Sequence, residues 1–379
     1  MHLKVRDIDA VCDIETAQWN ALTGTDYPFL RHEFLDALER SGAVSPHSGW
    51  TPRHLTLWQG QRLVGVMPRY FKDHSWGEYV FDWQWADAWE RAGGQYYPKQ
   101  LSAIPFTPAS GPRLALAEDI DAGAALTALA EHIEAAGLLS WHLLFPDADQ
   151  AARWRKAWPA LLERQSMQYH WFDRGYGDFD GFLATMTSKR RKETRRERRL
   201  VAEQGLTMRR LTGRDIDETA LHHFYRCYQI TYLEHGQRGY LDFEFFRLLW
   251  QRMPQALVLI QALDGTARPV AAALCLQGST TLYGRYWGSE VVASCLHFET
   301  CYYQGIEHCL ATGLNHFDPG TQGEHKIARG FEPIVTRSLH WLAHDGFRQA
   351  VEAFLGHERG AVDELRHRVS DMLPFRRGD

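Results

Sequence analysis

Long apolar runs and regular cysteine spacings are both missing from this 379-residue sequence. No stretch approaches eighteen consecutive apolar residues, so no membrane-spanning helix is expected. The first seven residues, MHLKVRD, lack the apolar core of a signal peptide. The six cysteines have no framework spacing, and five of them lie in the second half of the chain, which favours reduced thiols. Together these absences predict a cytoplasmic protein.

Several well-known catalytic motifs are absent as well. The sequence contains no Walker loop, no GxGxxG fingerprint and no GxSxG elbow. His297 and Cys301 are four residues apart, with Cys295 and His308 nearby, but no paired CxxC or HExxH spacing accompanies them. We therefore expect neither a bound metal nor a tightly bound cofactor.

The composition is that of a globular protein with one local excess of positive charge. A chain of 379 residues is too long for one ordinary core, so two domains are expected. The formal net charge is −5, yet eight of the eleven residues from 189 to 199 (KRRKETRRERR) are basic. A basic segment in an acidic chain indicates a focused anion site rather than a general nucleic-acid coat.

This basic segment contains only good helix formers and the neutral Thr194, so we predict one long helix over residues 179–203. At helical spacing Lys189, Lys192 and Arg196 share one face, and Arg191 and Arg195 share another. No acidic run of equal size lies nearby in the sequence to neutralise them. The alternative is an ordinary solvated helix, but the crowding of like charges favours an anionic partner, with phosphate the first candidate.

Both halves of the chain alternate between strand and helix patterns. In the first half, residues 53–58 and 62–70 read as a hairpin, and residues 124–136 as a helix. In the second half, residues 257–262, 270–276 and 280–287 read as strands, followed by a helix over 296–312 and a strand over 314–317. The similar order of elements predicts a mixed α/β fold with domains at 1–175 and 205–379, joined by a basic helix at 176–204.

An aromatic segment at residues 76–89 allows two interpretations. It can be a strand-to-helix corner that packs into the core. It can also be an aromatic wall for a substrate, with Glu78, Asp82 and Asp87 as polar contacts. A loop rich in proline and glycine follows over residues 96–113, and loops of this kind often line binding clefts.

The most informative turn follows the strand at 314–317. It contains Glu324, His325, Lys326 and Arg329 between glycines that allow sharp bends. His325 or Glu324 could accept a proton from an attacking amine, and Lys326 and Arg329 could stabilise an oxyanion or hold a phosphate. The alternative is a polar surface turn. Two further candidates, Tyr283 and Arg285, lie on the preceding strand, where a buried arginine needs a partner or a cleft.

Six motifs spread over most of the chain carry a family resemblance. They are PFLRHEFL at 28–35, GEYVFDW at 77–83, IPFTP at 104–108, the basic run at 189–199, LYGRYWG at 282–288 and QGEHKIARGF at 322–331. With these motifs the chain resembles the Fem-like predicted N-acyltransferases of the GNAT superfamily, described as peptidoglycan biosynthesis proteins. The resemblance implies two tandem GNAT-like domains with a basic connecting helix.

The resemblance also implies a reaction. Fem-type enzymes move an aminoacyl unit from aminoacyl-tRNA to the amine of a peptidoglycan precursor that bears a diphosphate. A lysine in the loop after the late strand contributes to their site, and Lys326 falls at that place. Basic side chains hold the precursor's phosphates, which fits Lys189, Arg191, Lys192, Arg195 or Arg196.

One departure from the wider superfamily concerns the acyl donor. Users of acetyl-CoA usually carry an (R/Q)xxGx(G/A) turn before the long helix, whereas residues 288–296 here read GSEVVASCL. This favours a tRNA-carried or other donor over acetyl-CoA. Two alternatives stay open: a non-catalytic protein that binds RNA or another anion on a GNAT scaffold, and an acyl-CoA-dependent enzyme acting on a small molecule.

Overall fold

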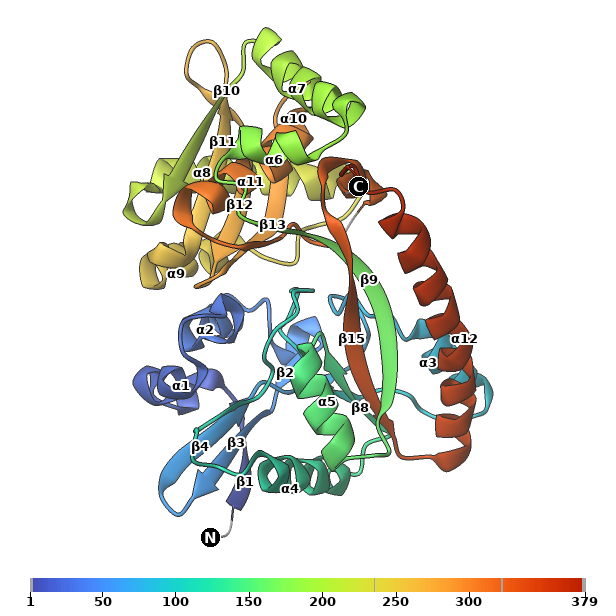
Figure 1. The fold of residues 1–379 in the computed structure, drawn as a ribbon. Helices are drawn as coiled ribbons and strands as arrows, with labels where there is room; N and C mark the ends of the chain where they lie inside the picture. Colours follow the sequence, from blue (N-terminus) through green and yellow to red (C-terminus); the bar gives the residue numbers. More distant parts are fainter. Residues whose placement is uncertain (1–2, 235, 322, 377–379) are drawn as a thin grey trace. The chain divides into compact units, whose positions relative to one another are not determined.

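The computed structural model describes residues 3–234, 236–321 and 323–376 (Figure 1). The chain divides into two compact units. The first unit contains Met1–Ser166 and Val335–Glu364, and the second contains Met167–Ile334 and Leu365–Asp379. These bounds differ from the predicted 1–175 and 205–379 because the end of the chain passes back through the first unit. No helix in the described ranges is long and apolar enough to cross a membrane.

Three elements contain the points at which the chain passes between the units. They are strand β9 (Leu162–Phe172), strand β15 (Glu332–Leu342) and helix α12 (Asp345–Ser370). The sequence patterns did not predict β15 or α12.

Two sheets form the framework of the first unit. One is antiparallel, in the order β1-β3-β4-β7, and the other has the order β15-β8-β6-β5-β2 with β6 and β8 parallel. The strands not yet placed are β1 (Leu3–Ile8), β2 (Trp50–Pro52), β3 (His54–Gln59), β4 (Arg62–Met67), β5 (Tyr70–Lys72), β6 (Lys99–Ser102), β7 (Ala115–Leu116) and β8 (Ser140–Leu144). Strands β3 and β4 confirm the predicted hairpin.

Helices cover these sheets and complete the core. They are α1 (Thr16–Thr23), α2 (His32–Arg40), α3 (Trp83–Arg91), α4 (Ala122–Ala135) and α5 (Ala148–Ala157). Asp121 and Asp147 cap α4 and α5 by accepting backbone N–H groups of the first turn. Trp141, Trp154 and Trp158 pack together between these helices and the strands, so several tryptophans of this sequence form core.

The second unit is built on a sheet in the order β10-β11-β12-β13-β14-β9. Its strands besides β9 are β10 (Thr207–Thr212), β11 (Leu257–Leu263), β12 (Pro269–Gln277), β13 (Thr281–Ser289) and β14 (His316–Asp318). Strands β10 to β13 are antiparallel neighbours, and β14 runs parallel to β13. Each strand predicted in this half is present.

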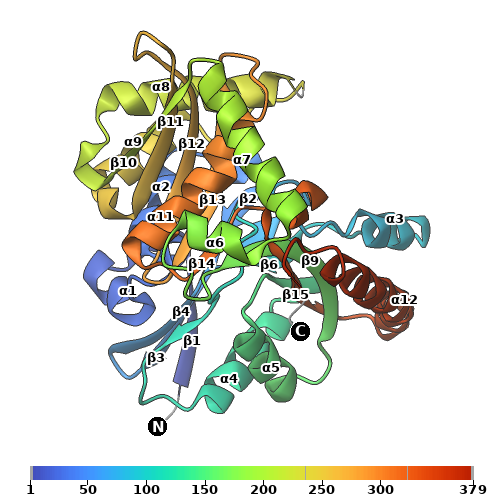
Figure 2. The same ribbon diagram turned by 45° about the horizontal axis from the view of Figure 1, so that its top comes forward.

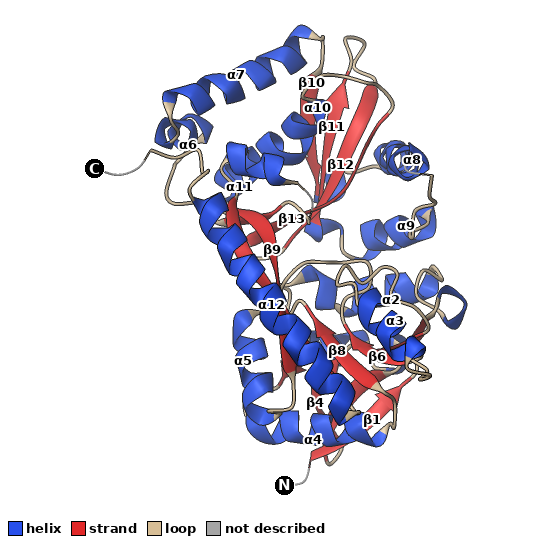
Figure 3. Cartoon of the chain, turned by 90° about the vertical axis from the view of Figure 1, so that its right-hand side faces the viewer, coloured by secondary structure: helices blue, strands red, loops and turns tan. Residues whose placement is uncertain are grey.

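Helices lie on both faces of this second sheet (Figure 3). Helices α8 (Glu218–Glu234) and α9 (Phe243–Arg252) cover one face. Helices α10 (Leu296–Phe298) and α11 (Gln304–Thr312) cover the other, joined by a π-helical turn at Glu299–Tyr303. The predicted helix over 296–312 is therefore present, with one wider turn inside it.

The prediction of a single helix over 179–203 is wrong. The segment forms two helices, α6 (Phe179–Thr185) and α7 (Ser188–Glu203), which Figure 2 shows as separate. Met186 breaks the helix because its backbone is extended and its side chain is fully buried. Thr187 donates its N–H to the carbonyl of Pro374 instead of continuing the helix. The basic helix α7 belongs to the second unit.

Candidate active site

Strands β13 and β14 part at the point where the polar turn begins. They pair over three positions only, ending at Tyr283 and Asp318, while β13 continues to Ser289. A Cβ atom at Gly284 would lie 3.2 Å from the Cα of Pro319, so glycine lets the chain leave β14 close against β13. The first residue of the predicted 322–331 motif lies outside the described residues.

Lys326 is the buried centre of this turn. It lies on a short 3₁₀-helix, Glu324–Arg329, and only 1% of its surface is exposed. Its Nζ donates to the carbonyl oxygen of Gly320 at 2.5 Å. Burial lowers its pKa to about 8, although the charge of Asp318 acts in the opposite direction. Since one carbonyl uses one of three N–H donors, the ammonium has further capacity to bind.

His325 and Glu324 are exposed beside it. The His325 Nε2 shares a hydrogen bond of 2.8 Å with the Oη of Tyr302. Partial burial lowers the pKa of His325, and the charges of Arg329 and Lys326 act in the same direction. His325 is therefore mostly neutral at pH 7 and able to take up a proton.

Arg329 connects the turn to the basic helix. Its guanidinium donates to both carboxylate oxygens of Glu197 on α7, at 2.5 and 3.2 Å. It also donates to the carbonyl oxygen of His325 at 2.7 Å and lies 3.4 Å above the ring of Phe298. A bidentate, largely buried pair of this kind fixes the orientation of both groups. The arginine that we predicted as a phosphate ligand is thus already held by a carboxylate.

The π-helical turn places two consecutive tyrosines at this junction. Tyr302 reaches His325, and the hydroxyl of Tyr303 donates to Glu197. Burial raises the pKa of both phenols, so both remain protonated. Wider helical turns are frequent at functional sites because they redirect side chains in this way.

Asp318, at the end of β14, lies beside two neighbouring imidazoles, the buried His170 and the partly buried His316. It lies 3.4 Å from the Nε2 of His170, which in turn contacts His316 at 2.7 Å. His316 also shares a hydrogen bond with Thr281 at 3.1 Å. Burial lowers the pKa of His170, and it lowers that of His316 to about 4. Both rings are neutral at pH 7, which leaves Asp318 and Lys326 as the charges at the base of the turn.

The charges on α7 fall into two groups. Five of the eight cations of the basic run were expected to bind substrate, but Arg195 is paired with Asp180 at 2.9 Å. Arg198 is held by Glu299 and Glu307. No acidic run lies beside the basic run, as expected, but single carboxylates neutralise part of it: Asp180 from the neighbouring helix α6, and Glu299 and Glu307 from elements distant in sequence. In the described part of the chain, no ion pair involves the remaining four predicted ligands, Lys189, Arg191, Lys192 and Arg196.

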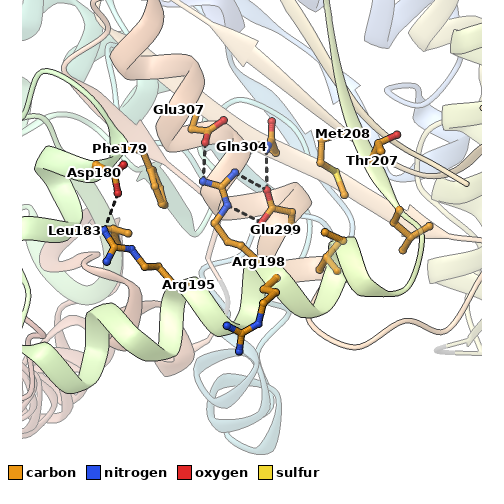
Figure 4. Close-up of a pocket in the computed structure, with 14 residues that line it drawn as sticks. Phe179, Asp180, Leu183, Arg195, Arg198, Thr207, Met208, Glu299, Gln304 and Glu307 are labelled. Carbon is orange, nitrogen blue, oxygen red and sulfur yellow. Dashed lines mark hydrogen bonds and ion pairs between the residues drawn. The ribbon is translucent and has the colours of Figure 1, made fainter. Parts of the chain in front are cut away.

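A cavity of about 610 Å³ lies beside α7 (Figure 4). Arg195 and Arg198 project into it together with the carboxylates that pair with them. Neither His325 nor Lys326 is among the described residues that line it. The cavity therefore lies next to the basic helix and is lined by both basic and acidic side chains. The described part of the polar turn, with His325 and Lys326, does not line it.

The other predicted residues have different surroundings. Tyr283 is buried next to Asp318, and Arg285 occupies a β-bulge of β13 with its guanidinium 5.6 Å above the ring of Tyr286. Glu78 and Asp82 belong to the first unit, where both are buried and accept hydrogen bonds from the Nζ of Lys99 at 2.8 and 2.6 Å.

Sequence reasoning missed several members of the site. Glu197, an acidic residue within the basic run, was not predicted as a site residue, and Tyr302 and Tyr303 were predicted only as part of the helix over 296–312. Asp318, which directly follows the predicted strand at 314–317, was not predicted as a site residue either. An acidic residue inside a basic run, and an aromatic pair in a helix, were the available signals.

Comparisons with known proteins agree with this fold. The crystal structure of FemX aligns with a TM-score of 0.52 at 11% identity, covering 93% of this chain and 100% of that chain. The C-terminal domain of a putative lysylphosphatidylglycerol synthetase from Agrobacterium fabrum aligns with a TM-score of 0.55 at 8% identity, covering 90% and 95%. The structure of L-PGS from Bacillus licheniformis aligns with a TM-score of 0.50 at 9% identity, covering 93% and 98%.

A search among curated proteins finds no match to the chain. The FemAB-like family, described as acting in peptidoglycan biosynthesis or recognition, matches residues 10–377. This match confirms the resemblance and the tandem GNAT-like fold predicted from the sequence, and it supports the assignment as an acyltransferase. The chain belongs to the FemAB-like family.

Proposed function

We propose that this protein is an N-acyltransferase that joins an activated aminoacyl group to an amine acceptor bearing phosphate-like groups. The observation that carries the proposal is Lys326. Lys326 is only 1% exposed, and its pKa is lowered to about 8. It lies where strands β13 and β14 separate, and a buried lysine with such a shifted pKa is a candidate functional residue. Family membership and fold agree with acyl transfer.

The exposed side of α7 supports an anionic substrate. Lys189, Lys192 and Arg196 are exposed, stand at helical spacing on one face and have no carboxylate partner in the described ranges. Glu197 on the same helix contacts Arg329 and Tyr303 of the candidate site. A phosphate bound to this face would therefore lie on the same helix that supports the reacting centre.

Two observations favour aminoacyl-tRNA as the donor. The turn at 288–296 lacks the glycines that bind the pyrophosphate of acetyl-CoA. One of the similar folds belongs to a putative lysylphosphatidylglycerol synthetase, whose name describes a lysyl group joined to the anionic lipid phosphatidylglycerol. Aminoacyl transfer to an anionic acceptor is the chemistry that this name and the Fem-like resemblance have in common.

The proposed reaction is a direct displacement. The acceptor nitrogen attacks the carbonyl carbon of the aminoacyl ester, and the C–O bond to the tRNA breaks as the amide C–N bond forms. The proton lost by the nitrogen passes to His325 or Glu324, and the departing oxygen takes up a proton. Lys326 offsets the negative charge of the tetrahedral intermediate. In the tautomer of His325 whose Nε2–H donates to the Oη of Tyr302, Nδ1 is the nitrogen that accepts the proton.

The test is a transfer assay with the purified 379-residue chain, charged tRNA and a diphosphate-linked muramoyl-peptide acceptor. Amide product is detected by mass spectrometry. Lys326→Met is expected to lower the rate about 100-fold or more, with an unchanged circular dichroism spectrum. The exposed Lys156→Met serves as matched control and should retain full rate.

Three results would contradict parts of the proposal. Product formed only from acyl-CoA would overturn the choice of donor. Turnover unaffected by Lys326→Met would remove this residue from the reaction. No turnover with either donor, combined with salt-sensitive anion binding that survives Lys326→Met, would identify a non-catalytic binding protein.

A further inference from the structure

Helix α8 and the end of β13 bring one histidine, one cysteine and one glutamate together in the second unit. His223 and Cys227 are four residues apart on α8, so their side chains share one face of the helix. Glu290 directly follows β13, and its carboxylate completes the group. The three ligand atoms lie within 4.8 Å of one another, and no other trio of His, Cys, Asp and Glu side chains in the described ranges is this compact. His297 and Cys301, which have the same spacing, belong to no such group among these residues.

The distances within this group match those around a tetrahedral zinc ion. The Sγ of Cys227 lies 3.5 Å from the Nε2 of His223, and the same nitrogen lies 3.9 Å from the Oε1 of Glu290. Zn–S and Zn–N bonds of about 2.3 and 2.1 Å at a tetrahedral angle place sulfur and nitrogen about 3.6 Å apart, and nitrogen and oxygen about 3.3 Å apart. The histidine and the cysteine are therefore already at ligating distance, and only a small movement of the glutamate is required.

A close approach of β13 to α8 positions the glutamate. A Cβ atom at Gly288 would lie 1.8 Å from the carbonyl oxygen of Cys227, so glycine is required where the strand passes the helix. Glu290 lies two residues further along, and its N–H donates to the carbonyl oxygen of Val270 on β12 at 2.8 Å. The ligands are thus fixed by separate backbone elements, which a coordinated ion would tie together.

The imidazole is presented in the form that a metal ion binds. Its Nε2 faces Cys227 and Glu290, whereas its Nδ1 faces the side-chain amide of Gln261 at 3.4 Å. Ligating histidines usually have a polar neighbour at their second nitrogen. Burial lowers the pKa of His223, although the charge of Glu290 and a hydrogen bond to the carbonyl of Pro269 raise it. The ring is therefore neutral at pH 7.

The same pair does not suit a thiol nucleophile. Cys227 and His223 are 0% and 2% exposed, so a substrate does not reach the sulfur. Burial raises the pKa of the Cys227 thiol to about 12, so the thiolate needs an additional cation beside it. A coordinated metal ion supplies that cation, because it deprotonates a ligating thiol. The thiolate and the carboxylate of Glu290 together then neutralise a divalent ion.

Glu290 provides the entry path. Its side chain is 21% exposed, so an ion and a water molecule reach the group from this side. The present partner of the carboxylate is Arg226, whose Nε lies 3.3 Å from Oε1. The Arg226 side chain is 59% exposed and turns into solvent at little cost when an ion takes its place. The other nearby cation, Arg268, pairs with Asp264 at 3.5 Å.

We propose that His223, Cys227 and Glu290 bind one zinc ion, with a water molecule as the fourth ligand. One nitrogen, one sulfur and one oxygen suit Zn²⁺ and disfavour Mg²⁺ and Ca²⁺, which prefer oxygen alone. The ion ties α8 to residues 289–295, the segment that leads from β13 to α10. This proposal is independent of acyl transfer. It differs from the sequence-based expectation of no bound metal, which considered other residues.

The experiment adds CoCl₂ to the metal-free 379-residue chain and follows the thiolate-to-cobalt charge-transfer absorption, which ZnSO₄ should then displace at one equivalent per chain. Cys227→Ala should abolish this absorption, and Glu290→Gln should weaken cobalt binding about tenfold or more. The matched control is Cys275→Ala, a buried cysteine on β12 outside the group, which should bind as the unaltered chain does. Zinc at about 100 times its Kd should raise the melting temperature of the unaltered chain by about 5 °C and leave that of Cys227→Ala unchanged.

Glu290→Gln keeps the size of a partly exposed side chain, so it tests the site even if the cavity in Cys227→Ala weakens the fold. An unaltered chain without charge-transfer absorption overturns the proposal. Absorption that persists in Cys227→Ala assigns the ion to another thiolate and also overturns it. Zinc binding that both variants leave unchanged identifies an adventitious ion only, with the same consequence.

Discussion

Lys99 in the first unit and Lys326 in the second are both fully buried, and they are held in opposite ways. Lys99 in the first unit is surrounded by Ser75, Glu78 and Asp82. Burial alone would lower its pKa, but the charges of Asp82 and Glu78 raise it above the ordinary value. Lys326 in the second unit donates to a single backbone carbonyl, and burial lowers its pKa to about 8.

This difference separates a structural lysine from a reactive one. Because two carboxylates contact it, Lys99 is a permanent cation, and all three of its N–H groups donate hydrogen bonds. With one neutral acceptor, Lys326 retains donors and changes its charge near physiological pH, which suits a group that must respond to a developing negative charge. Burial by itself therefore does not identify a catalytic lysine, because carboxylate partners make a buried lysine a permanent cation.

The largest expected effect comes from removing the structural lysine. Lys99→Met leaves Glu78 and Asp82 buried without their cation, which should lower the free energy of unfolding by about 3–5 kcal/mol. Chemical denaturation followed by circular dichroism measures this loss. A change below about 1 kcal/mol would show that the carboxylates do not depend on Lys99.

The matched change in the second unit should affect rate and not stability. Lys326→Met removes a buried cation with one neutral partner, so the folded chain should be at least as stable at pH 7 while transfer falls about 100-fold. Because the folded-state pKa of Lys326 is lowered to about 8 from 10.5, the unaltered chain gains stability as pH rises from 8 to 10.5, and the variant should lose that gain. Denaturation at pH 7 and pH 10 checks both statements.

Glu78 provides a smaller, pH-dependent contrast. Burial raises its pKa to about 7, although Lys99 acts in the opposite direction. Its folded-state pKa is above the free value of 4.5, so its contribution to stability is complete below pH 4.5 and is lost as pH rises through 7. Glu78→Gln should remove this decline and raise stability at pH 8 by about 1–3 kcal/mol relative to the unaltered chain. Melting temperatures at pH 5 and pH 8 decide the matter, and an unchanged pH dependence would contradict it.

The smallest expected effect is a shift in the pH dependence of transfer. The rate should fall as pH rises through about 8, where Lys326 loses its proton. Lys326→Arg keeps the charge at all pH values in this range, so its alkaline decline should be absent even if its absolute rate is lower. A decline at the same pH in both proteins would assign it to another group.

Local patterns predicted most elements, because hydrophobic periodicity and turn residues act over a few positions. The β3–β4 hairpin and the strands β11, β12 and β13 were found in this way. The break at Met186 was not, because it depends on contacts with the end of the chain around Pro374. Strand β15 and helix α12 contain none of the motifs identified in the sequence, so neither element was predicted.

The candidate site was predictable to a similar extent. Lys326 and His325 stand in one turn, so their proximity follows from the sequence. Glu197 and Arg329 are 132 residues apart, and only the fold brings them together. Lys99 lay in a segment interpreted as an irregular loop, so the ionic cluster it forms with Glu78 and Asp82 could not be seen beforehand.

Titration of the lysine Cε resonances by ¹³C NMR, with Lys326 assigned through Lys326→Arg, tests the contrast between the two lysines most directly. We expect Lys326 to titrate with a midpoint near 8, while the Lys99 signal, assigned through Lys99→Arg, does not move below pH 10.5. The signal of Lys72, which is also buried and has a pKa lowered to about 7, is identified separately through Lys72→Arg. A midpoint for Lys326 at or above 10.5 would contradict its assignment as the reactive lysine.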